Sequence, residues 1–339
     1  MEEKQIKTII DHCALPDSCN EAQLIETHIS WLVLADQYAF KVKKPHQLSF
    51  LDFSPLQKRK YYAYQEIVLN RRLTEDIYLQ VLPIKECNDH VAIGAEEGTT
   101  IDYAVQMRKL DVDHQMHLLL QKDQVSDEDV QKIASIIGAF HQTTDVEWHA
   151  FDLRALEQSF NDIASVKEVV TQHLNDSKSD GIDQAIQWSN QFLEAHKEIF
   201  EQRKEQGMIR DCHGDLHSRN IFIYEKPVIF DCIEFNEAFR QIDVLNEIGF
   251  FTMDLEAHGQ GELAKAFMDT YLNKFPCINT AEEESLLTYY KAYRANVRAK
   301  VTALKVDQLE EEAQRKEAVN NIKLYLDLMM QYLRSLTSH

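Results

Sequence analysis

Apolar and polar positions alternate along short segments in the first third of the chain, which is the pattern of half-buried β-strands. A longer stretch between these segments has helical spacing. It opens at Ser54 and Pro55, which suit the N-cap and the first helical position, and is predicted to run to about Leu73. The predicted strands are residues 24–26, 31–34, 38–42, 78–84 and 101–108. This part of the chain therefore predicts a five-stranded sheet with one main helix packed on it.

From Asp111 onward, apolar positions recur at helical spacing almost to the end of the chain. Ser126 followed by Asp129 is predicted to cap the first of these helices. The predicted helices are residues 126–142, 151–173, 182–206, 240–258, 261–274, 281–305 and 309–334. We therefore predict an α+β protein that divides within residues 108–111, with a mixed domain at 1–108 and a mainly helical domain at 109–339.

One polar stretch interrupts the helices, residues 211–231, which read DCHGDLHSRNIFIYEKPVIFD. Its polar first half is followed by two short apolar runs with a turn between them, which predicts a loop opening into a β-hairpin. Such a hairpin returns Asp231 to the side of Asn220, and Asp215 lies five residues before Asn220. Three oxygen-bearing side chains that converge in this way suit a hard cation such as Mg²⁺ and a phosphate group.

The charge balance narrows the class of partner. The chain has 339 residues, with 36 Lys and Arg against 56 Asp and Glu, and a formal net charge of -20. Contacts to nucleic-acid backbones and anionic lipids need a basic surface, so we expect no nucleic-acid and no membrane partner. No apolar run approaches the ~18 residues that span a bilayer, and the first residues lack a secretory signal. The six cysteines form no CxxC pair, which favours reduced thiols in a cytoplasmic protein.

The polar stretch also carries a family resemblance. HGDLHSRN followed by IFD resembles the catalytic loop and the metal-binding segment of the aminoglycoside phosphotransferase-like branch of the protein-kinase-like superfamily. Asp215 and Asn220 keep the spacing of the kinase pattern H-R-D-L-x-x-x-N, and Asp231 stands where the DFG aspartate would. The resemblance implies a two-lobe fold, with an antiparallel five-stranded sheet and one main helix in the N-lobe and a mainly helical C-lobe.

Four further segments, ETHISWLVL, YAFKVKKP, LDFSPLQKRK and LNRRL, extend this resemblance to a bacterial group of phosphotransferase-like proteins. In some members of that group a P-loop ATP-binding domain is fused to the C-terminal side. The 339 residues contain neither GxxxxGKS nor GxxxxGKT, so we expect this chain to be without that domain. The resemblance covers essentially the whole chain.

The resemblance implies a role for each polar residue of the stretch. Asp215 would accept a hydrogen bond from a substrate hydroxyl and orient it toward the γ-phosphate of ATP. Asn220 and Asp231 would hold Mg²⁺ against the nucleotide phosphates. His213 and His217 flank Asp215 and leave a rival open, because His-x-Asp-x-His can ligate Zn²⁺ or Fe in a hydrolase. Nothing nearby in the sequence completes such a site in a recognisable pattern.

The predicted third strand supplies a basic partner for the phosphates. Lys41 stands where the lysine of the kinase V-A-I-K pattern lies, so the resemblance implies that it contacts the α- and β-phosphates. Lys43 is two residues further on and shares that face of a strand, so the residues alone leave both lysines as candidates. Glu66, on the predicted helix, is the partner expected to hold Lys41 in place.

Two further nucleotide contacts are expected from the strand order. Kinases cover the phosphates with a glycine-rich loop between the first two strands, whereas this chain has the glycine-free turn 27–30. The Ser30 hydroxyl and the backbone amides of this turn are candidates to donate to a phosphate, and an ordinary hairpin turn is the alternative. Residues 106–110, which include Met107, would form the hinge whose backbone faces the adenine.

Recognition of the acceptor stays open at this level. Glu234 and Asn236, just beyond the polar stretch, are candidates to face it. Arg294 and Arg298 are four residues apart on a predicted helix, so they share a face and suit either an anionic acceptor or salt bridges. The acidic balance of the chain would equally suit an amine.

The sequence therefore predicts an ATP- and Mg²⁺-dependent phosphotransferase that moves the γ-phosphate to an alcohol group of a small molecule. Two alternatives remain within the same fold. One is a protein Ser/Thr kinase or self-phosphorylating enzyme, and the other is a catalytically silent pseudokinase that binds nucleotide as a regulatory module. The retention of Lys41, Glu66, Asp215, Asn220 and Asp231 argues against a silent protein.

Overall fold

The computed structural model describes residues 1–16, 19–48, 50–88, 90–148 and 152–337, so the predicted helix start at residue 151 lies outside it. The chain forms two compact units, each built from two stretches of sequence. Compact units need not coincide with functional lobes, so the predicted division within residues 108–111 stays a prediction. Unit 1 is Met1–Leu118 with Arg219–Arg240, and unit 2 is Leu119–Ser218 with Gln241–His339.

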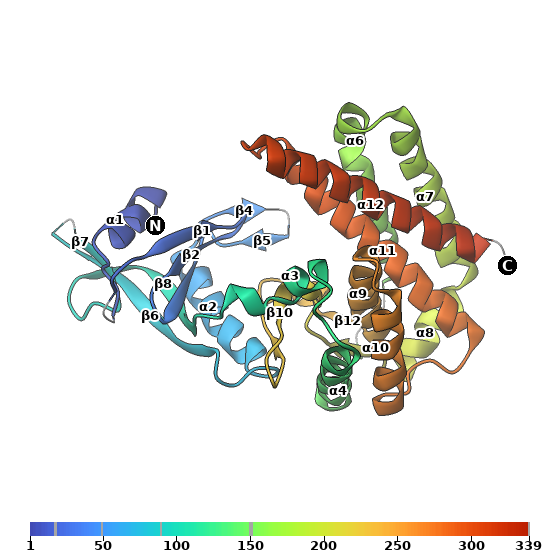
Figure 1. Ribbon diagram of the computed structural model, residues 1–339, viewed down its shortest axis with the longest axis horizontal. Helices are drawn as coiled ribbons and strands as arrows, with labels where there is room; N and C mark the ends of the chain where they lie inside the picture. Colours follow the sequence, from blue (N-terminus) through green and yellow to red (C-terminus); the bar gives the residue numbers. More distant parts are fainter. Residues whose placement is uncertain (17–18, 49, 89, 149–151, 338–339) are drawn as a thin grey trace. The chain divides into compact units, whose positions relative to one another are not determined.

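Unit 1 is built on one antiparallel sheet whose strand order is β1-β2-β3-β8-β6-β7 (Figure 1). All five predicted strands are present. The sixth, β7, was not predicted, because it has only four residues and its apolar positions, Val91 and Ile93, are just two. The strands are β1 (Gln23–Glu26), β2 (Ser30–Leu34), β3 (Tyr38–Lys43), β6 (Tyr78–Cys87), β7 (His90–Ile93) and β8 (Thr99–Arg108).

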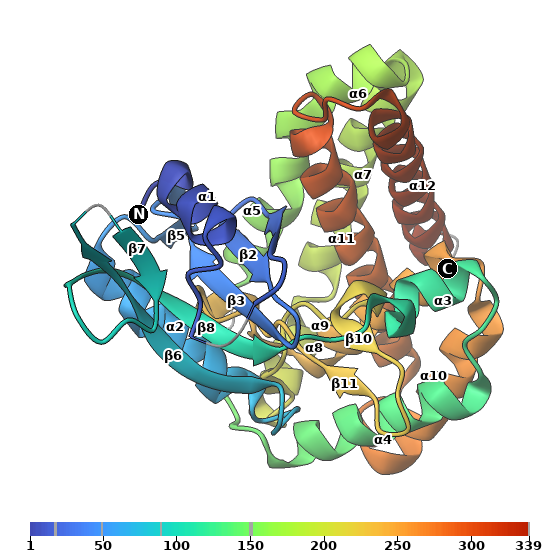
Figure 2. The ribbon, with the colours of Figure 1, turned by 60° about the vertical axis from the view of Figure 1, so that its left-hand side comes forward.

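The two faces of this sheet have separate cores. One face packs against α1 (Glu3–Asp11) and takes the even-numbered residues of β3. The other face packs against α2 (Leu56–Asn70) and takes the odd-numbered residues of β3 (Figure 2). Because side chains of a strand alternate with a period of two, Lys41 and Lys43 both lie on the α2 face.

The helix α2 begins later than the sequence predicted. Its N-cap is Pro55, and the first helical residue is Leu56. Ser54 does not cap the helix, because its hydroxyl donates a hydrogen bond to Asp52 Oδ1 at 2.6 Å. Instead, the buried guanidinium of Arg59 donates to the Ser54 carbonyl at 2.8 Å and ties the helix to the residues before it.

The second stretch of unit 1 contains the predicted hairpin, which is confirmed. Its strands β10 (Ile221–Phe222) and β11 (Val228–Ile229) pair antiparallel. The Phe230 N–H donates to the Asn220 carbonyl at 3.1 Å, so the open end of the hairpin carries Asn220 and Asp231 on neighbouring strands. The remaining elements of unit 1 are the ribbon of β4 (Gln47–Leu48) with β5 (Leu51–Asp52), η1 (Val112–His114) and η4 (Glu237–Phe239).

Unit 2 is mainly helical, and together the two units confirm the predicted α+β class. Helix α9 (Val244–Ala257) is its centre, since every residue from Val244 to Leu255 is buried. Helices α11 and α12 are each 26 residues long and lie side by side (Figure 1, Figure 2). The other helices are α4 (Asp127–Thr143), α5 (Leu153–Asn161), η2 (Asp162–Val166), α6 (Lys167–His173), α7 (Asp176–Ala195), α8 (Lys197–Glu205), α10 (Gly261–Lys274), α11 (Ala281–Val306) and α12 (Glu312–Thr337). One ribbon joins β9 (Ile209–Asp211) and β12 (Gln241–Asp243), and the short helices α3 (Met116–Gln121) and η3 (Ser218–Asn220) lie at the crossings between the units.

Capping in unit 2 partly follows the sequence. The predicted cap of α4 is confirmed, since Ser126 and Asp129 form a reciprocal capping box. The helix expected at residues 182–206 is divided into α7 and α8 at His196, which leaves helical geometry without interrupting the apolar spacing. Across the described ranges, no helix is both long enough and apolar enough to cross a membrane.

Candidate active site

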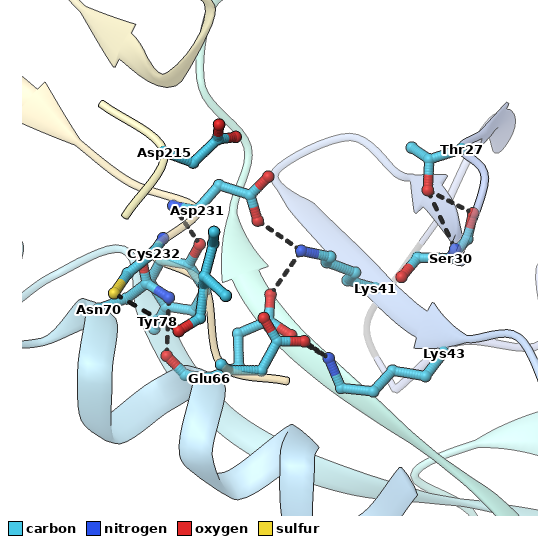
Figure 3. A network of polar contacts seen from close by, with 12 residues as sticks. Thr27, Ser30, Lys41, Lys43, Glu66, Asn70, Tyr78, Asp215, Asp231 and Cys232 are labelled. Carbon is cyan, nitrogen blue, oxygen red and sulfur yellow. Dashed lines mark hydrogen bonds and ion pairs between the residues drawn. The ribbon is translucent and has the colours of Figure 1, made fainter. Parts of the chain in front are cut away.

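The α2 face of the sheet in unit 1 carries a buried network of charged side chains, drawn in Figure 3. Lys41 Nζ donates a hydrogen bond to Asp231 Oδ1 at 2.6 Å and forms an ion pair with Glu66 Oε1 at 2.8 Å. Glu66 is fully buried, whereas 40% of the Asp231 side chain is exposed. The three predicted residues therefore meet in unit 1, and the partly exposed group among them is the carboxylate of Asp231.

Lys43 belongs to the same network but has a different environment. Its Nζ donates to Glu66 Oε2 at 2.8 Å and also contacts Glu234, and it lies 5.1 Å from the centre of the Phe53 ring. Only 2% of the Lys43 side chain is exposed, against 16% for Lys41. Glu66 thus bridges the two lysines with its two oxygens, and the inner lysine is enclosed.

The electrostatics keep this network ionised. Burial acts to raise the pKa of Glu66, but the charges of Lys41 and Lys43 outweigh it and lower this pKa to about 2. Burial likewise acts to lower the pKa of Lys41, and Asp231 and Glu66 raise it well above its ordinary value. Glu66 is therefore a carboxylate at neutral pH and holds Lys41 in its charged form.

Asp231 is held by its backbone, and its carboxylate remains partly exposed. Its φ of +66° is in the left-handed region, where a non-glycine residue is strained. The Asp231 N–H donates to the Tyr78 hydroxyl at 3.1 Å, and the next N–H, of Cys232, donates to Asn70 Oδ1 at 2.9 Å. Asn220 adds an amide oxygen at the same end of the hairpin. A carboxylate and an amide oxygen are a donor set that fits Mg²⁺.

Ser30 and Met107 lie elsewhere in unit 1. Ser30 is buried, its N–H donates to Thr27 Oγ1 at 3.0 Å, and its own Oγ has no hydrogen-bond partner in the described residues (Figure 3). An unpaired hydroxyl at this turn is free to donate to a ligand. Met107 is buried in the core under α2, opposite Ala39 of β3, so its side chain contributes packing. The role expected for its backbone stays a prediction.

In unit 2 the loop around Asp215 is fixed to the central helix α9. The N–H groups of His213 and Gly214 donate to the two oxygens of Glu247 at 2.8 and 2.7 Å. The N–H of Ser218 donates to Asp254 Oδ2 at 2.8 Å. Two buried carboxylates of one helix therefore fix both ends of the loop.

Glu247 and Asp254 were missed by the sequence analysis. Glu247 also accepts from His141 of α4, and burial acts to raise its pKa, but the His141 contact and His213 lower this pKa to about 2. The available signal was the presence of two carboxylates in an otherwise apolar helical segment, because buried charges occur almost only with partners.

Asp215 itself is ionised and partly exposed. Burial acts to raise the pKa of Asp215, but His217, Arg298 and His213 lower it below its ordinary value. His217 Nε2 is 3.4 Å from Asp215 Oδ2, and the Asp215 N–H donates to His213 Nδ1 at 3.2 Å. The carboxylate is thus available as a hydrogen-bond acceptor at neutral pH.

The two histidines are built into the fold. His213 and His217 are buried, and the ring of His217 packs against Phe250 with centroids 5.3 Å apart. Within the described ranges, the ligand atoms close enough to share a metal ion are those of His141, Cys212 and Glu247, a group that includes neither histidine of the His-x-Asp-x-His pattern. Nothing in the site therefore favours the hydrolase rival.

Two residues proposed to face the acceptor have other contacts. Glu234 is buried against Lys43, and burial raises its pKa despite that lysine. Asn236 caps η4 by accepting from the Ala238 N–H at 3.1 Å, and it donates to the Phe50 carbonyl at 3.3 Å. These contacts stabilise the segment that follows Asp231, and the role expected for the two residues at the acceptor stays a prediction.

Fold and site together define a protein-kinase-like fold, with a Lys–Glu pair between sheet and helix in one unit and a fixed aspartate loop in the other. A choline kinase from Cryptosporidium parvum matches 99% of this chain and 97% of its own, with a TM-score of 0.56 and 11% identity. An ethanolamine kinase from Plasmodium vivax matches 95% of this chain and 87% of its own (TM-score 0.52, 10% identity). A microcompartment-associated aminopropanol kinase matches 98% of each chain (TM-score 0.51, 14% identity).

Similarity in sequence reaches proteins of two mycobacteria. Uncharacterized proteins of Mycobacterium tuberculosis and Mycobacterium bovis are each 26% identical to this chain over 293 residues, or 85% of it. The chain spans 56% of the length of these curated relatives. No protein-family model matches the chain.

Proposed function

We propose that the protein is an ATP- and Mg²⁺-dependent phosphotransferase that moves the γ-phosphate of ATP to a hydroxyl group of a small molecule. The observation that carries this proposal is the Lys41–Glu66–Asp231 arrangement, in which a buried glutamate holds a charged lysine beside a partly exposed carboxylate. The similar folds named above are those of kinases for choline, ethanolamine and aminopropanol, and this supports a small-molecule acceptor.

In this proposal, unit 1 binds the nucleotide. Lys41 contacts the α- and β-phosphates and exchanges part of its contact with Asp231 for them. Asn220 and Asp231 hold Mg²⁺, which neutralises the charge of the phosphates when bound. The Ser30 hydroxyl donates to a phosphate, and the backbone around Met107 faces the adenine. Lys43 is assigned to the interior of the unit, because both oxygens it meets are buried.

Asp215 of unit 2 acts on the acceptor. As an ionised carboxylate it accepts a hydrogen bond from the hydroxyl and orients that oxygen for in-line attack. Asp215 and Asn220 are five positions apart in the sequence, and five extended residues span at most roughly 18 Å. The covalent chain therefore limits how far apart the Cα atoms of these two residues can be.

Two substitutions test this division of labour. Asp215→Ala should reduce phosphoryl transfer by about 10²- to 10⁴-fold and leave Mg-ATP binding unchanged, because the base acts on the acceptor. Asp231→Ala should weaken Mg-ATP binding itself. The measurements are the thermal shift with ATP and Mg²⁺, followed by transfer from radiolabelled ATP to a panel of alcohols.

The control for both is Asp269→Ala, which removes an exposed carboxylate paired with Lys265 on α10. It should change neither quantity. Full transfer by Asp215→Ala would make the mechanism wrong. Binding of Mg-ATP without turnover on any acceptor would favour the pseudokinase alternative.

A further inference from the structure

The second half of α11, from Arg294 onward, has one basic face. Arg294, Arg298 and Lys305 are spaced by four and seven residues. At about 100° per residue, these three positions lie within roughly 40° of one another around the helix axis. They therefore form a continuous basic face along about three turns of α11.

The central helix α9 places this face beside the Asp215 loop. The guanidinium carbon of Arg294 lies 4.7 Å from the centre of the Phe250 ring, and Arg294 Nε donates to Asn246 Oδ1 at 2.6 Å. The ring of His217 contacts the same phenylalanine. One helical turn beyond Phe250, Asp254 holds the Ser218 N–H at the end of the loop. Arg294 of the basic face and His217 of the loop thus both contact Phe250 of α9.

The positive charges of this face are not fully neutralised. Arg298 lies over the Tyr325 ring at 5.5 Å, and its buried Nε has no hydrogen-bond partner among the residues that the structure describes. In the part of the chain that the structure describes, no carboxylate is within ion-pair distance of Arg298 or Lys305. Burial and the charge of Arg298 lower the pKa of Lys305, although Asp215 acts to raise it. Arg298 and Lys305 therefore act on each other as like charges, and Asp215 attracts both of them without an ion-pair contact.

Other cations of the same helix are paired. Lys291 contacts Glu256 at 2.6 Å, and Lys300 contacts Asp162 at 2.7 Å. Near the loop, by contrast, Asp215 and Asp254 act on Arg298 without an ion-pair contact, and Asp215 acts in the same way on the exposed Lys305. Among the described residues, Arg298 and Lys305 thus lack the carboxylate contact that Lys291 and Lys300 of the same helix have.

We propose that the phosphate acceptor is an anionic alcohol, a small hydroxyl compound that also carries a carboxylate or phosphate group, and that Arg298 and Lys305 bind this group while Asp215 orients the hydroxyl. The inference rests on the proposed function and specifies its substrate class. The proposed acceptor differs in charge from choline, ethanolamine and aminopropanol, the compounds in the names of structurally similar kinases. Arg298 and Lys305 would repel such a cationic acceptor.

A set of three-carbon alcohols tests the charge of the acceptor with little change in shape. The probes are glycerol phosphate, glycerate, glycerol and serinol, which run from anionic through neutral to cationic. Binding is measured by calorimetry with Mg²⁺ and a non-hydrolysable ATP analogue present, and transfer is measured with radiolabelled ATP. Glycerol phosphate and glycerate should bind and react at least about tenfold better than glycerol, and serinol worst.

Variants then localise the preference to α11. Lys305→Met and Arg298→Met should each raise the KM for the anionic probe by about ten- to a hundredfold, with the KM for ATP unchanged. Lys300→Met is the matched control, because it removes a paired lysine from the same helix. It should leave both KM values unchanged. Equal effects of Lys305→Met and Lys300→Met would overturn the assignment.

The outcomes also separate this inference from the function on which it rests. No advantage of the anionic probes over glycerol, including the absence of any binding, would overturn the acceptor class. Transfer to serinol or glycerol alone would overturn it too, while leaving a phosphotransferase. Failure to bind Mg-ATP, together with failure to transfer to any alcohol, would overturn the proposed function instead.

Discussion

Two lysines on β3, identical in type and two positions apart, have different physical situations. Lys41 and Lys43 point to the same face and share Glu66, one on each carboxylate oxygen. The second partner decides the difference: Lys41 meets the partly exposed Asp231, whereas Lys43 meets the buried Glu234. A buried lysine between two buried carboxylates holds unit 1 together, and a lysine beside an exposed carboxylate has access to a ligand.

This difference predicts that replacing each lysine by methionine affects a different property of the protein: stability for Lys43 and nucleotide binding for Lys41. Lys43→Met should reduce the free energy of unfolding by about 3–5 kcal/mol, because it leaves buried carboxylates with uncompensated charge. Lys41→Met should have the smaller effect on stability and should weaken Mg-ATP binding about tenfold or more. Urea unfolding and nucleotide titration measure the two quantities.

Lys58→Met serves as the control, since Lys58 is half exposed and pairs with Asp52 on the surface. Its effect on stability should be at most about 1 kcal/mol. If Lys43→Met were as mild as Lys58→Met, the buried network would not have the structural role assigned to it.

At the scale of elements, the Asp215 loop depends on a helix that is distant in sequence. Glu247 of α9 accepts from the loop backbone and from His141 of α4, so one carboxylate joins three elements. Burial acts to raise the pKa of Glu247 from its ordinary value of 4.5, but the contact with His141 outweighs burial, and the pKa is lowered to about 2. The loop geometry is therefore coupled to the ionisation of Glu247.

The coupling gives a pH dependence with a defined sign. Because the folded-state pKa is lowered, the stability contributed by ionised Glu247 is present above about pH 4.5 and is lost as the pH falls toward about 2. Between about pH 7 and about pH 4, wild type should lose about 1 kcal/mol more than Glu247→Gln. Urea unfolding at both values measures this difference. An equal loss of unfolding free energy in wild type and in Glu247→Gln would contradict the coupling.

At the scale of the whole molecule, each unit takes in two stretches of the chain, and one of the three connections between the units lies within the proposed active-site segment. The last residue of unit 2 before the crossing is Ser218, and unit 1 resumes at Arg219. Asp215 and Asn220 are therefore on different units although they belong to one motif. The motif is local in sequence, but its two halves are positioned by different cores.

The formal net charge of -20 is also a property of the whole molecule. Like charges repel in the compact state, so added salt should stabilise the protein. Raising NaCl from about 10 mM to about 150 mM shortens the screening length from roughly 30 Å to about 8 Å and should raise the Tm by a few degrees at neutral pH. The same salt change near the isoelectric point of about 5.1 should have little effect. Equal shifts at both pH values would contradict this explanation.

The sequence by itself determined most of the elements and the positions of the motif residues. The five predicted strands, the hairpin and the cap of α4 follow from alternation, helical spacing and turn chemistry, which act between near neighbours. The same locality explains the errors. The start of α2 depends on where Ser54 donates its hydrogen bond, and the break at His196 leaves the apolar spacing intact.

Only the tertiary structure decided which charged residues are partners. The assignment of Lys43 to Glu234 and of the Asp215 loop to Glu247 rests on contacts between residues far apart in the chain. Hydrophobic periodicity carries no information on such pairs, because burial sets which residues lie inside but not which opposite charges meet there. The polar stretch at residues 211–231 thus predicted the chemistry, while α2 within unit 1 and α9 within unit 2 supply the charged partners of its residues.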